Sequence, residues 1–245
     1  SGPLSIANIC AIAKEHGIPV LVDAAAEEPV RPNIHLAAGA SLVCYSGGKC
    51  LRGPQSSGML IGDKSLCQAA YYQAAPHHAY GRALKCSKEE AMGLLAAVEQ
   101  WYKRDHAGEQ KMWRGWLQTI EARLKPLPST TFEYLEPNDL SNRAPRLRVR
   151  WNANRLGITG TELASKLDAA TPRILLESGQ GRRPDAMASS LSIMPYMMDP
   201  GEDRIVADAI FAALSNPGRF SDPVVPSGAL ASIGGAWAVT VTYPP

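Results

Sequence analysis

Apolar side chains in the first part of the chain recur in patterns typical of an α/β fold. Residues 5–16 carry apolar side chains at helical spacing, and Ser5 is placed to cap the amino end of that helix. Short apolar runs follow, and they are typical of strands buried in a sheet. These runs are residues 19–22, 40–45 and 57–62. The succession of helix, strands and glycine-rich loops indicates an α/β layout.

A helical pattern replaces the strand pattern in the middle of the chain. Residues 88–104 and 108–124 both have a mixed amphipathic spacing, and Pro126 ends the second stretch. We therefore expect one long connecting helix, bent near Gly108.

Beyond Pro128 the pattern predicts a small α+β domain. Residues 146–151 alternate basic and apolar side chains, as a half-exposed strand does. Residues 173–177 and 190–198 predict further strands, and two amphipathic stretches predict helices. Those helices are residues 159–167, capped by Thr159 or Thr161, and residues 202–214. This order indicates helices on one face of an antiparallel sheet.

The changes of pattern divide the chain into four expected parts. Residues 1–85 belong to a large α/β domain, residues 86–126 form connecting helices, and residues 127–217 form the small domain. Residues 218–245 are a linker with a final strand, because proline, serine and glycine dominate before the last apolar run. The chain opens at Ser1 without a methionine, and its first helix has no strand before it. We expect both ends to be cut from a longer protein.

Composition narrows the classes of partner. Apolar residues make up 45% of the 245 residues, which suits a globular protein with a sizeable core. The 25 basic and 23 acidic residues give a net charge of +2, so neither nucleic acid nor an anionic membrane is expected as a partner. The five cysteines are odd in number and irregular in spacing, which argues against a zinc site or a disulfide framework. Reduced thiols in a cytoplasmic protein are the simplest interpretation.

The glycine-rich stretch after the second predicted strand carries the most informative chemistry. It contains Ser46-Gly47-Gly48-Lys49 and then Arg52-Gly53-Pro54-Gln55. A lysine on a short turn just past a strand is held in position and partly desolvated, which favours the free amine that an aldehyde cofactor requires. Ser46 and Arg52 are natural ligands for a phosphate group. Taken alone, the glycine-glycine-lysine triplet is more typical of a surface turn.

An acidic residue at the end of the preceding predicted strand makes the pattern more specific. A pyridoxal-phosphate site needs a carboxylate against the pyridine nitrogen, so that the ring acts as an electron sink. Parallel strands would deliver Asp23 and Lys49 to the same rim of the sheet, where open α/β sheets bind ligands. An aspartate here is by itself equally typical of a turn or helix cap, but the pair at successive strand ends predicts a cofactor site.

This part of the sequence resembles the fold-type-I pyridoxal-phosphate enzymes. The matching segments are Val20-Leu21-Val22-Asp23-Ala24-Ala25-Ala26-Glu27, Ser46-Gly47-Gly48-Lys49 and Gly53-Pro54-Gln55. Within these enzymes it looks most like the L-seryl-tRNA(Sec) selenium transferase (selenocysteine synthase) group, which includes D-glucosaminate-6-phosphate ammonia-lyase. The motif match covers about residues 18–62, and from residue 82 to 214 only the layout is similar.

The resemblance implies roles for single residues. Lys49 matches the Schiff-base lysine, Asp23 matches the carboxylate at the pyridine nitrogen, and Ser46 matches a position that helps to bind the phosphate. Gly53-Pro54-Gln55 matches a segment near the site that, in related dimers, lies close to the neighbouring subunit. The expected cofactor-binding residues are Asp23, Ser46, Gly48, Lys49, Arg52 and Gln55.

The resemblance also implies an architecture. The chain would be the C-terminal half of a fold-type-I large domain followed by the small α+β domain, in a homodimer or larger homo-oligomer. Family members are longer at the amino end, where the glycine-rich phosphate cup and the residue stacked on the pyridine ring lie. This chain would therefore hold about half of the cofactor site. A match to the basic tRNA-binding amino-terminal domain of the selenium transferases is not found in these residues, so we do not expect tRNA as a partner.

Two residues outside the motif are candidates for substrate binding. Arg173 opens a predicted small-domain strand and could bind a substrate carboxylate, a task that arginine often has in this fold type, but an exposed strand-edge arginine is equally typical. His77 follows the third strand and could face the substrate, although a solvated histidine pair is the more typical interpretation. No further ligands at suitable spacing support a metal site.

The sequence thus predicts a pyridoxal-phosphate-dependent lyase or transferase that acts on an amino acid or amino-sugar acid. In that reaction the substrate amine displaces Lys49 from the imine, and the freed Lys49 abstracts the α-proton. Asp23 keeps the ring protonated, and a β-substituent leaves. An aminotransferase of the class-V kind would use the same residues. A truncated, non-catalytic module with a structural or interaction role is the third alternative.

Overall fold

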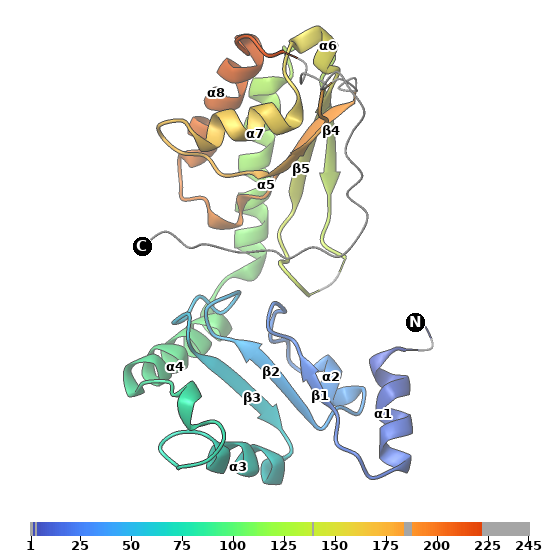
Figure 1. Cartoon of the computed structure of the whole chain (residues 1–245), viewed down its shortest axis with the longest axis vertical. Helices are drawn as coiled ribbons and strands as arrows, with labels where there is room; N and C mark the ends of the chain where they lie inside the picture. The colour runs from blue at the N-terminus through green and yellow to red at the C-terminus, as the bar shows by residue number, and fades with distance from the viewer. Residues whose placement is uncertain (1, 3, 139, 184–187, 222–245) are drawn as a thin grey trace, which may run out of the picture.

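Two regions lie one above the other along the long axis of the molecule (Figure 1). The computed structural model describes residue 2 and residues 4–138, 140–183 and 188–221. We call residues 4–104 the lower region and residues 127–221 the upper region. Helix α5 (His106–Leu124) runs from one to the other.

The lower region contains the strands that the apolar runs predicted. Among the described residues, β1 (Leu21–Asp23), β2 (Leu42–Ser46) and β3 (Gly58–Gly62) form a sheet in that order. Strand β1 is parallel to β2, as the argument for a shared rim requires, and β3 is antiparallel to β2. The predictions of these strands are confirmed.

Helices flank this lower sheet. Helix α1 (Ile6–Glu15) begins as predicted, because the Ser5 hydroxyl accepts a hydrogen bond from the Asn8 N–H at 3.3 Å. Cys10 of α1 packs with Val43 of β2 in a small apolar cluster. The remaining helical segments are α2 (Ile34–Ala37), α3 (Lys64–Gln73), η1 (Arg82–Leu84) and α4 (Lys88–Lys103). The sequence did not predict α3, in which no residue is fully buried and polar residues alternate with few large apolar ones.

The expected single connecting helix is two helices. Helix α4 ends at Lys103 and α5 begins at His106, so the prediction of a bend near Gly108 is wrong by about one helical turn. The physical reason is a cap: the Asp105 carboxylate accepts a hydrogen bond from the Gly108 N–H at 2.9 Å, which starts a new helix there.

The upper region is built on an antiparallel sheet, as predicted. In the described part of the chain its strand order is β4 (Thr131–Leu135), β5 (Arg146–Trp151), β7 (Ser189–Ile193) and β6 (Glu177–Gln180). The sequence missed β4. The strand predicted for residues 173–177 is wrong, since β6 begins only at Glu177. The strand predicted for residues 190–198 is too long, because Pro195 opens the short 3-10 helix η2 (Pro195–Met197).

Helices cover one face of the upper sheet. Between α6 (Ala153–Leu156) and β6 lies α7 (Gly160–Asp168), and α8 (Glu202–Ser215) follows η2. Thr159, not Thr161, caps α7 in a capping box with Glu162. The apolar faces of α5, α7 and α8 pack on the inward side chains of β5 and β7 in one continuous core.

The predicted final strand at residues 236–243 lies outside the described residues, as does most of the predicted linker. None of the helices in the described part of the chain combines the length and the hydropathy that a bilayer crossing requires.

Candidate functional site

The loop after β2 folds back on itself and fixes the position of Lys49. The Gly47 N–H donates to the Ser57 carbonyl at 2.8 Å, and the Gly53 N–H donates to the Gly47 carbonyl at 2.7 Å. A side chain at Gly47 would collide with Ser57, and a Cβ atom at Gly48 would lie 2.6 Å from the Gln55 Cα. Only glycine allows this close approach of two chain segments, which explains why glycines precede the lysine.

Asp23 and Lys49 lie at the carboxyl ends of adjacent parallel strands. Asp23 pairs in register with Cys44 of β2, and Lys49 follows the end of that strand. The Asp23 carboxylate accepts a hydrogen bond from the Ala25 N–H at 3.0 Å, and the Cys44 thiol lies 3.7 Å from it. Burial, together with the Asp23 charge, raises the pKa of the Cys44 thiol. The structure therefore brings both residues to one rim of the lower sheet.

One expectation about Lys49 is wrong for this chain. We expected its amine to be partly desolvated, but the residue is exposed, as is Asp23. The reason is that Lys49 lines an open cleft, where solvent reaches its side chain.

This cleft has a volume of about 570 Å³ and lies between the lower and upper regions. The predicted residues that line it are Gly48, Lys49, Arg52 and Gln55. The opposite wall comes from α5 and from residues 196–200. Asp23 and Ser46, by contrast, do not line the cleft.

Arg52 is held by two contacts that the sequence did not reveal. Its guanidinium Nη1 lies 3.0 Å from the Glu109 carboxylate, and its Cζ lies 5.5 Å from the centre of the Tyr196 ring. Burial raises the pKa of the Tyr196 hydroxyl, and the nearby Arg52 charge opposes that rise. Tyr196 therefore stays protonated at neutral pH and is available as a hydrogen-bond donor.

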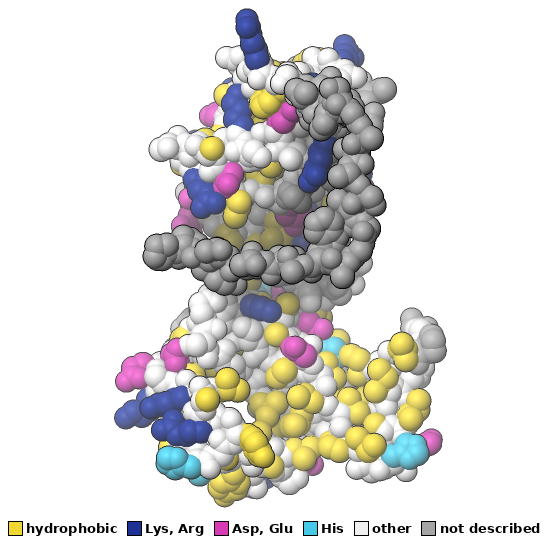
Figure 2. Space-filling model, viewed as in Figure 1, with side chains coloured by type: hydrophobic (Ala, Val, Ile, Leu, Met, Phe, Trp, Pro, Cys, Tyr) yellow, Lys and Arg dark blue, Asp and Glu magenta, His cyan; other side chains and the backbone are white. Residues whose placement is uncertain are grey.

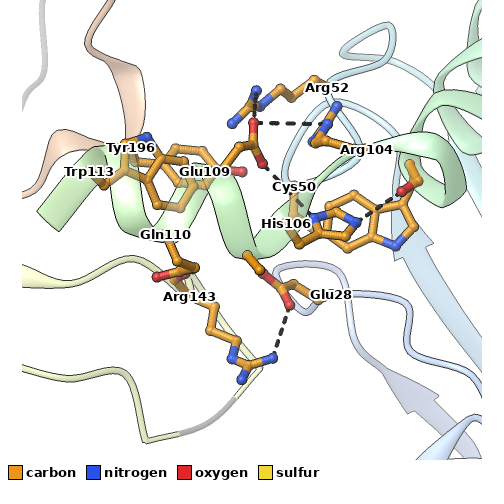
Figure 3. A pocket seen from close by; sticks show the side chains of 12 residues that line it. Glu28, Cys50, Arg52, Arg104, His106, Glu109, Gln110, Trp113, Arg143 and Tyr196 are labelled. Atoms are coloured by element: carbon orange, nitrogen blue, oxygen red, sulfur yellow. Dashed lines mark hydrogen bonds and ion pairs between the residues drawn. The ribbon is translucent and has the colours of Figure 1, made fainter. Parts of the chain in front are cut away.

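A smaller pocket of about 190 Å³ adjoins the cleft and is seen from close by in Figure 3. Arg52, Glu109, Trp113 and Tyr196 line both cavities. The other polar lining residues come from several segments and are Glu28, Cys50, Arg104, His106, Gln110 and Arg143. Sequence reasoning missed this set, because nothing in the local pattern links segments so far apart in the chain.

Cys50 forms part of the wall of this pocket. Its thiol donates to the Glu27 carbonyl at 2.8 Å, and burial raises its pKa to about 11. The thiol is therefore un-ionised and a weak nucleophile at neutral pH. This agrees with the interpretation of the residue as a small buried side chain.

The two predicted substrate-binding residues lie away from the cleft. The Arg173 Nε donates to the Asp168 carboxylate at 2.7 Å, and most of its side chain is exposed. The His77 ring contacts the ring of Tyr71 on α3, with 4.9 Å between ring centres. Neither residue lines the cleft or the smaller pocket, so the geometry gives these two predictions no support. In the described part of the chain, no group of three or more histidine, cysteine or acidic side chains is arranged to hold a metal ion.

Comparison with curated proteins identifies relatives across most of the chain. It is 32% identical over 166 residues to D-glucosaminate-6-phosphate ammonia lyase from Salmonella typhimurium. It is 29% identical over 202 residues to 5'-C-glycyluridine monooxygenase-decarboxylase from a Streptomyces species, and 28% identical over 204 residues to L-seryl-tRNA(Sec) selenium transferase from Klebsiella pneumoniae. These matches cover 68%, 81% and 77% of this chain. The chain spans only 42%, 47% and 41% of the relatives' own lengths.

A solved structure shows the fold. The chain superposes on alanine–glyoxylate aminotransferase from a Nostoc species with a TM-score of 0.50 and 12% identity, over 86% of this chain and 57% of that one. The predicted fold class, the C-terminal half of a type I large domain followed by a small α+β domain, is confirmed. The predicted similarity to the ammonia-lyase and selenium transferase group is confirmed as well. No family model matches the sequence.

Proposed function

We propose that this chain, a relative of D-glucosaminate-6-phosphate ammonia lyase and the selenium transferases with a type I fold, is part of a pyridoxal-phosphate-dependent lyase or transferase. Its substrate would be an amino acid or an amino-sugar acid. The observation that carries the proposal is the arrangement of Asp23 and Lys49 at the carboxyl ends of the parallel strands β1 and β2, with Lys49 on the cleft.

The residues around the cleft fit this cofactor. Lys49 offers an accessible amine on a rigid turn, which Gly48 permits by letting the chain pack closely against Gln55. Ser46, Arg52 and Gln55 would provide hydrogen bonds to the phosphate and ring substituents. Asp23 does not line the cleft, but it ends the neighbouring parallel strand, and from there its carboxylate would pair with the pyridine nitrogen. When bound, pyridoxal phosphate supplies an electron sink for negative charge that develops on the substrate.

The chain's own groups would then bind the substrate and move its protons. The Lys49 amine is the base that takes a proton from the substrate carbon next to the amino group. The Tyr196 hydroxyl would donate a hydrogen bond to a substrate oxygen; burial raises its pKa further above the neutral range. The Glu109 carboxylate holds the Arg52 guanidinium at the border of the cleft, which leaves other N–H groups of Arg52 free for an anionic group.

The attachment of the cofactor gives the first test. The purified protein is mixed with pyridoxal phosphate, reduced with borohydride and mapped by mass spectrometry of its peptides. We expect the pyridoxyl label on Lys49, loss of the label in Lys49→Ala, and retention in the matched control Lys64→Ala, an exposed lysine at the start of α3. Wild-type protein without label at Lys49, or an equal label in Lys49→Ala, would contradict the proposal.

The reaction class is tested separately. A lyase releases ammonia from the amino-acid substrate in each turnover, whereas an aminotransferase requires a keto acid as amino acceptor. We expect ammonia release without a keto acid, and a loss of about 100-fold or more in Lys49→Ala. Turnover that depends strictly on added keto acid would favour the aminotransferase alternative. A cytoplasmic homodimer or larger homo-oligomer remains a prediction from the sequence.

A further inference from the structure

The smaller pocket beside the cleft contains a carboxylate with more positive neighbours than it can neutralise (Figure 3). Glu109 lies 3.0 Å from Arg52, 4.0 Å from Arg104 and 3.9 Å from the Nδ1 atom of His106. The side chains of Arg104 and Glu109 are only 18% and 20% exposed. One carboxylate thus serves two guanidinium groups and an imidazole in a partly dry environment.

The other residues that line the pocket do not neutralise this excess of positive charge. The Arg143 guanidinium lies 3.3 Å from the Glu28 carboxylate, and these two charges cancel. The Gln110 amide donates to the Arg143 carbonyl and ties this segment to α5. Among the described lining residues, three arginines and two glutamates give a net charge of +1 before His106 is counted.

The helix that forms one wall adds to the positive potential. His106, Glu109 and Gln110 stand in the first turns of α5, where the helix dipole favours an anion. The N–H groups of His106, Gly108 and Glu109 are already bonded within the chain, so the dipole and not free N–H groups adds to the potential. Arg104 lies at the end of α4, with its guanidinium 5.4 Å from the centre of the Trp101 ring. A guanidinium that is largely buried is costly unless a negative charge compensates it. The α5 dipole and the largely buried Arg104 guanidinium come from different segments, and both make the electrostatic potential in the pocket positive.

We propose that this pocket binds the anionic group, a carboxylate or a phosphate, at the end of the substrate opposite to its reacting amine. The inference rests on the proposed function, because the reacting amine is placed at Lys49 in the adjoining cleft. Arg52, Glu109, Trp113 and Tyr196 line both cavities, so one extended ligand can contact both. The substrate class is therefore an amino acid with a second negative charge. Arg104 would supply the surplus positive charge, because it shares Glu109 with Arg52, and Arg143 would donate through N–H groups other than the Nη1 that faces Glu28.

Binding of inorganic phosphate to the purified protein tests the pocket without any turnover. The binding heat is measured by calorimetry for wild type, Arg104→Gln and Arg143→Gln. The matched control is Arg114→Gln, which removes an ion-paired arginine on α5 that lines neither cavity. We expect one phosphate per chain, weakening of at least about tenfold in each pocket variant, and no change in the control. Near-UV circular dichroism checks that each variant is folded.

The phosphate group of pyridoxal phosphate could occupy the same pocket in place of the substrate's anionic group. Phosphate binding is therefore measured again after loading with pyridoxal phosphate, and in Lys49→Ala. We expect binding to persist in both cases, which would separate this pocket from the cofactor site. Binding that disappears on cofactor loading would assign the pocket to the cofactor and overturn the inference. Equal binding by wild type and both pocket variants would overturn it as well.

The link to the substrate is tested with a matched pair of amino-sugar acids that differ only in a terminal phosphate. The cofactor absorbance of the loaded protein is titrated with D-glucosaminate-6-phosphate and with D-glucosaminate. We expect the phosphorylated compound to bind at least about tenfold more tightly, and Arg104→Gln to abolish that advantage. Equal affinities in wild type would overturn the substrate assignment while leaving the Lys49 proposal intact, since that proposal depends on the borohydride label.

Discussion

The upper and lower regions differ in how completely their apolar side chains are covered. In the upper region α5, α7 and α8 close one face of the sheet, and Leu147 and Ile210 are fully buried. The other face carries Arg148 and Arg150 of β5, which both reach Glu133 on β4. This alternation of inward apolar and outward paired charges gives the upper region a complete core and a polar surface.

The lower region leaves a broad apolar surface uncovered. Figure 2 shows hydrophobic side chains spread over this part of the molecule. The exposed members on and around α1, β1 and α2 are Leu4, Ile9, Ile12, Ile18, Leu21 and Ile34. Strand β1 is also an edge of its sheet, and nothing in the described part of the chain pairs with its outer side. A surface of this kind is typical of an interaction site.

The difference in apolar coverage between the two regions coincides with the position of the candidate catalytic residues. Asp23 ends the uncovered edge strand, and Lys49 follows its neighbour, so both belong to the less complete region. The upper region and the connecting helix α5 supply the opposite wall of the cleft, with Tyr196 from the first and Trp113 from the second. Stability and candidate catalysis are thus concentrated in different parts of the molecule, which the following changes can test.

The largest expected effect comes from a cavity in the upper core. Leu147→Ala should lower the free energy of unfolding by about 2–5 kcal/mol, because its side chain is fully buried on all sides. Leu51→Ala makes the same change in the small lower cluster with Cys50 and Trp101, and it should cost less, since a small cluster collapses more easily. Urea unfolding followed by circular dichroism measures both. A larger loss for Leu51→Ala would reverse the comparison.

A smaller effect is expected from the helix cap of α7. The Thr159 hydroxyl accepts a hydrogen bond from the Glu162 N–H at 3.2 Å, and Thr159→Ala should cost about 1 kcal/mol. The Ser5 hydroxyl caps α1 in the same way at 3.3 Å, so Ser5→Ala is the matched change in the lower region. We expect the Ser5 change to have less effect on global unfolding, because α1 buries only Cys10. Equal losses would show that the two helices are equally coupled to the cores.

A still smaller effect is expected on the apolar surface of the lower region. Ile12 is 58% exposed, so Ile12→Glu should change the free energy of unfolding by no more than about 0.5 kcal/mol. The same change should reduce binding of the dye ANS and self-association measured by light scattering, because it interrupts the exposed apolar patch. A loss of more than about 1 kcal/mol would instead show that Ile12 is buried by a contact in solution.

The last effect is absent at neutral pH and appears only in alkaline solution. The pKa of Cys50 is raised from 9.0 in its ordinary environment to about 11 in the folded chain, chiefly by burial. The folded state therefore holds this proton more tightly, so its contribution is constant below pH 9 and is lost as the pH rises toward 11. Cys50→Ala should flatten this part of the curve of stability against pH. An unchanged slope in the variant would assign it to other groups.

The local pattern predicted most elements that bury a regular face. Strands β1, β2, β3 and β5 have clear apolar runs or alternation, and α1 and α8 have clear periodicity. The hydrophobic pattern did not predict elements that bury few side chains, or boundaries that a single hydrogen bond sets. Helix α3 buries nothing, and Asp105 separates α4 from α5 through one capping bond. Pro195 ends the long run that was predicted as a strand.

The sequence by itself determined the glycine-rich turn, its lysine and the aspartate one strand earlier, because these depend on local chain geometry and on the fixed polarity of parallel strands. Only the tertiary structure decided what faces that lysine. Glu109, Tyr196 and Arg104 lie on separate segments, and they meet because α5 carries the upper region over the rim of the lower sheet. The exposure of Lys49 and the surplus positive charge beside it follow from that packing, which no local pattern encodes.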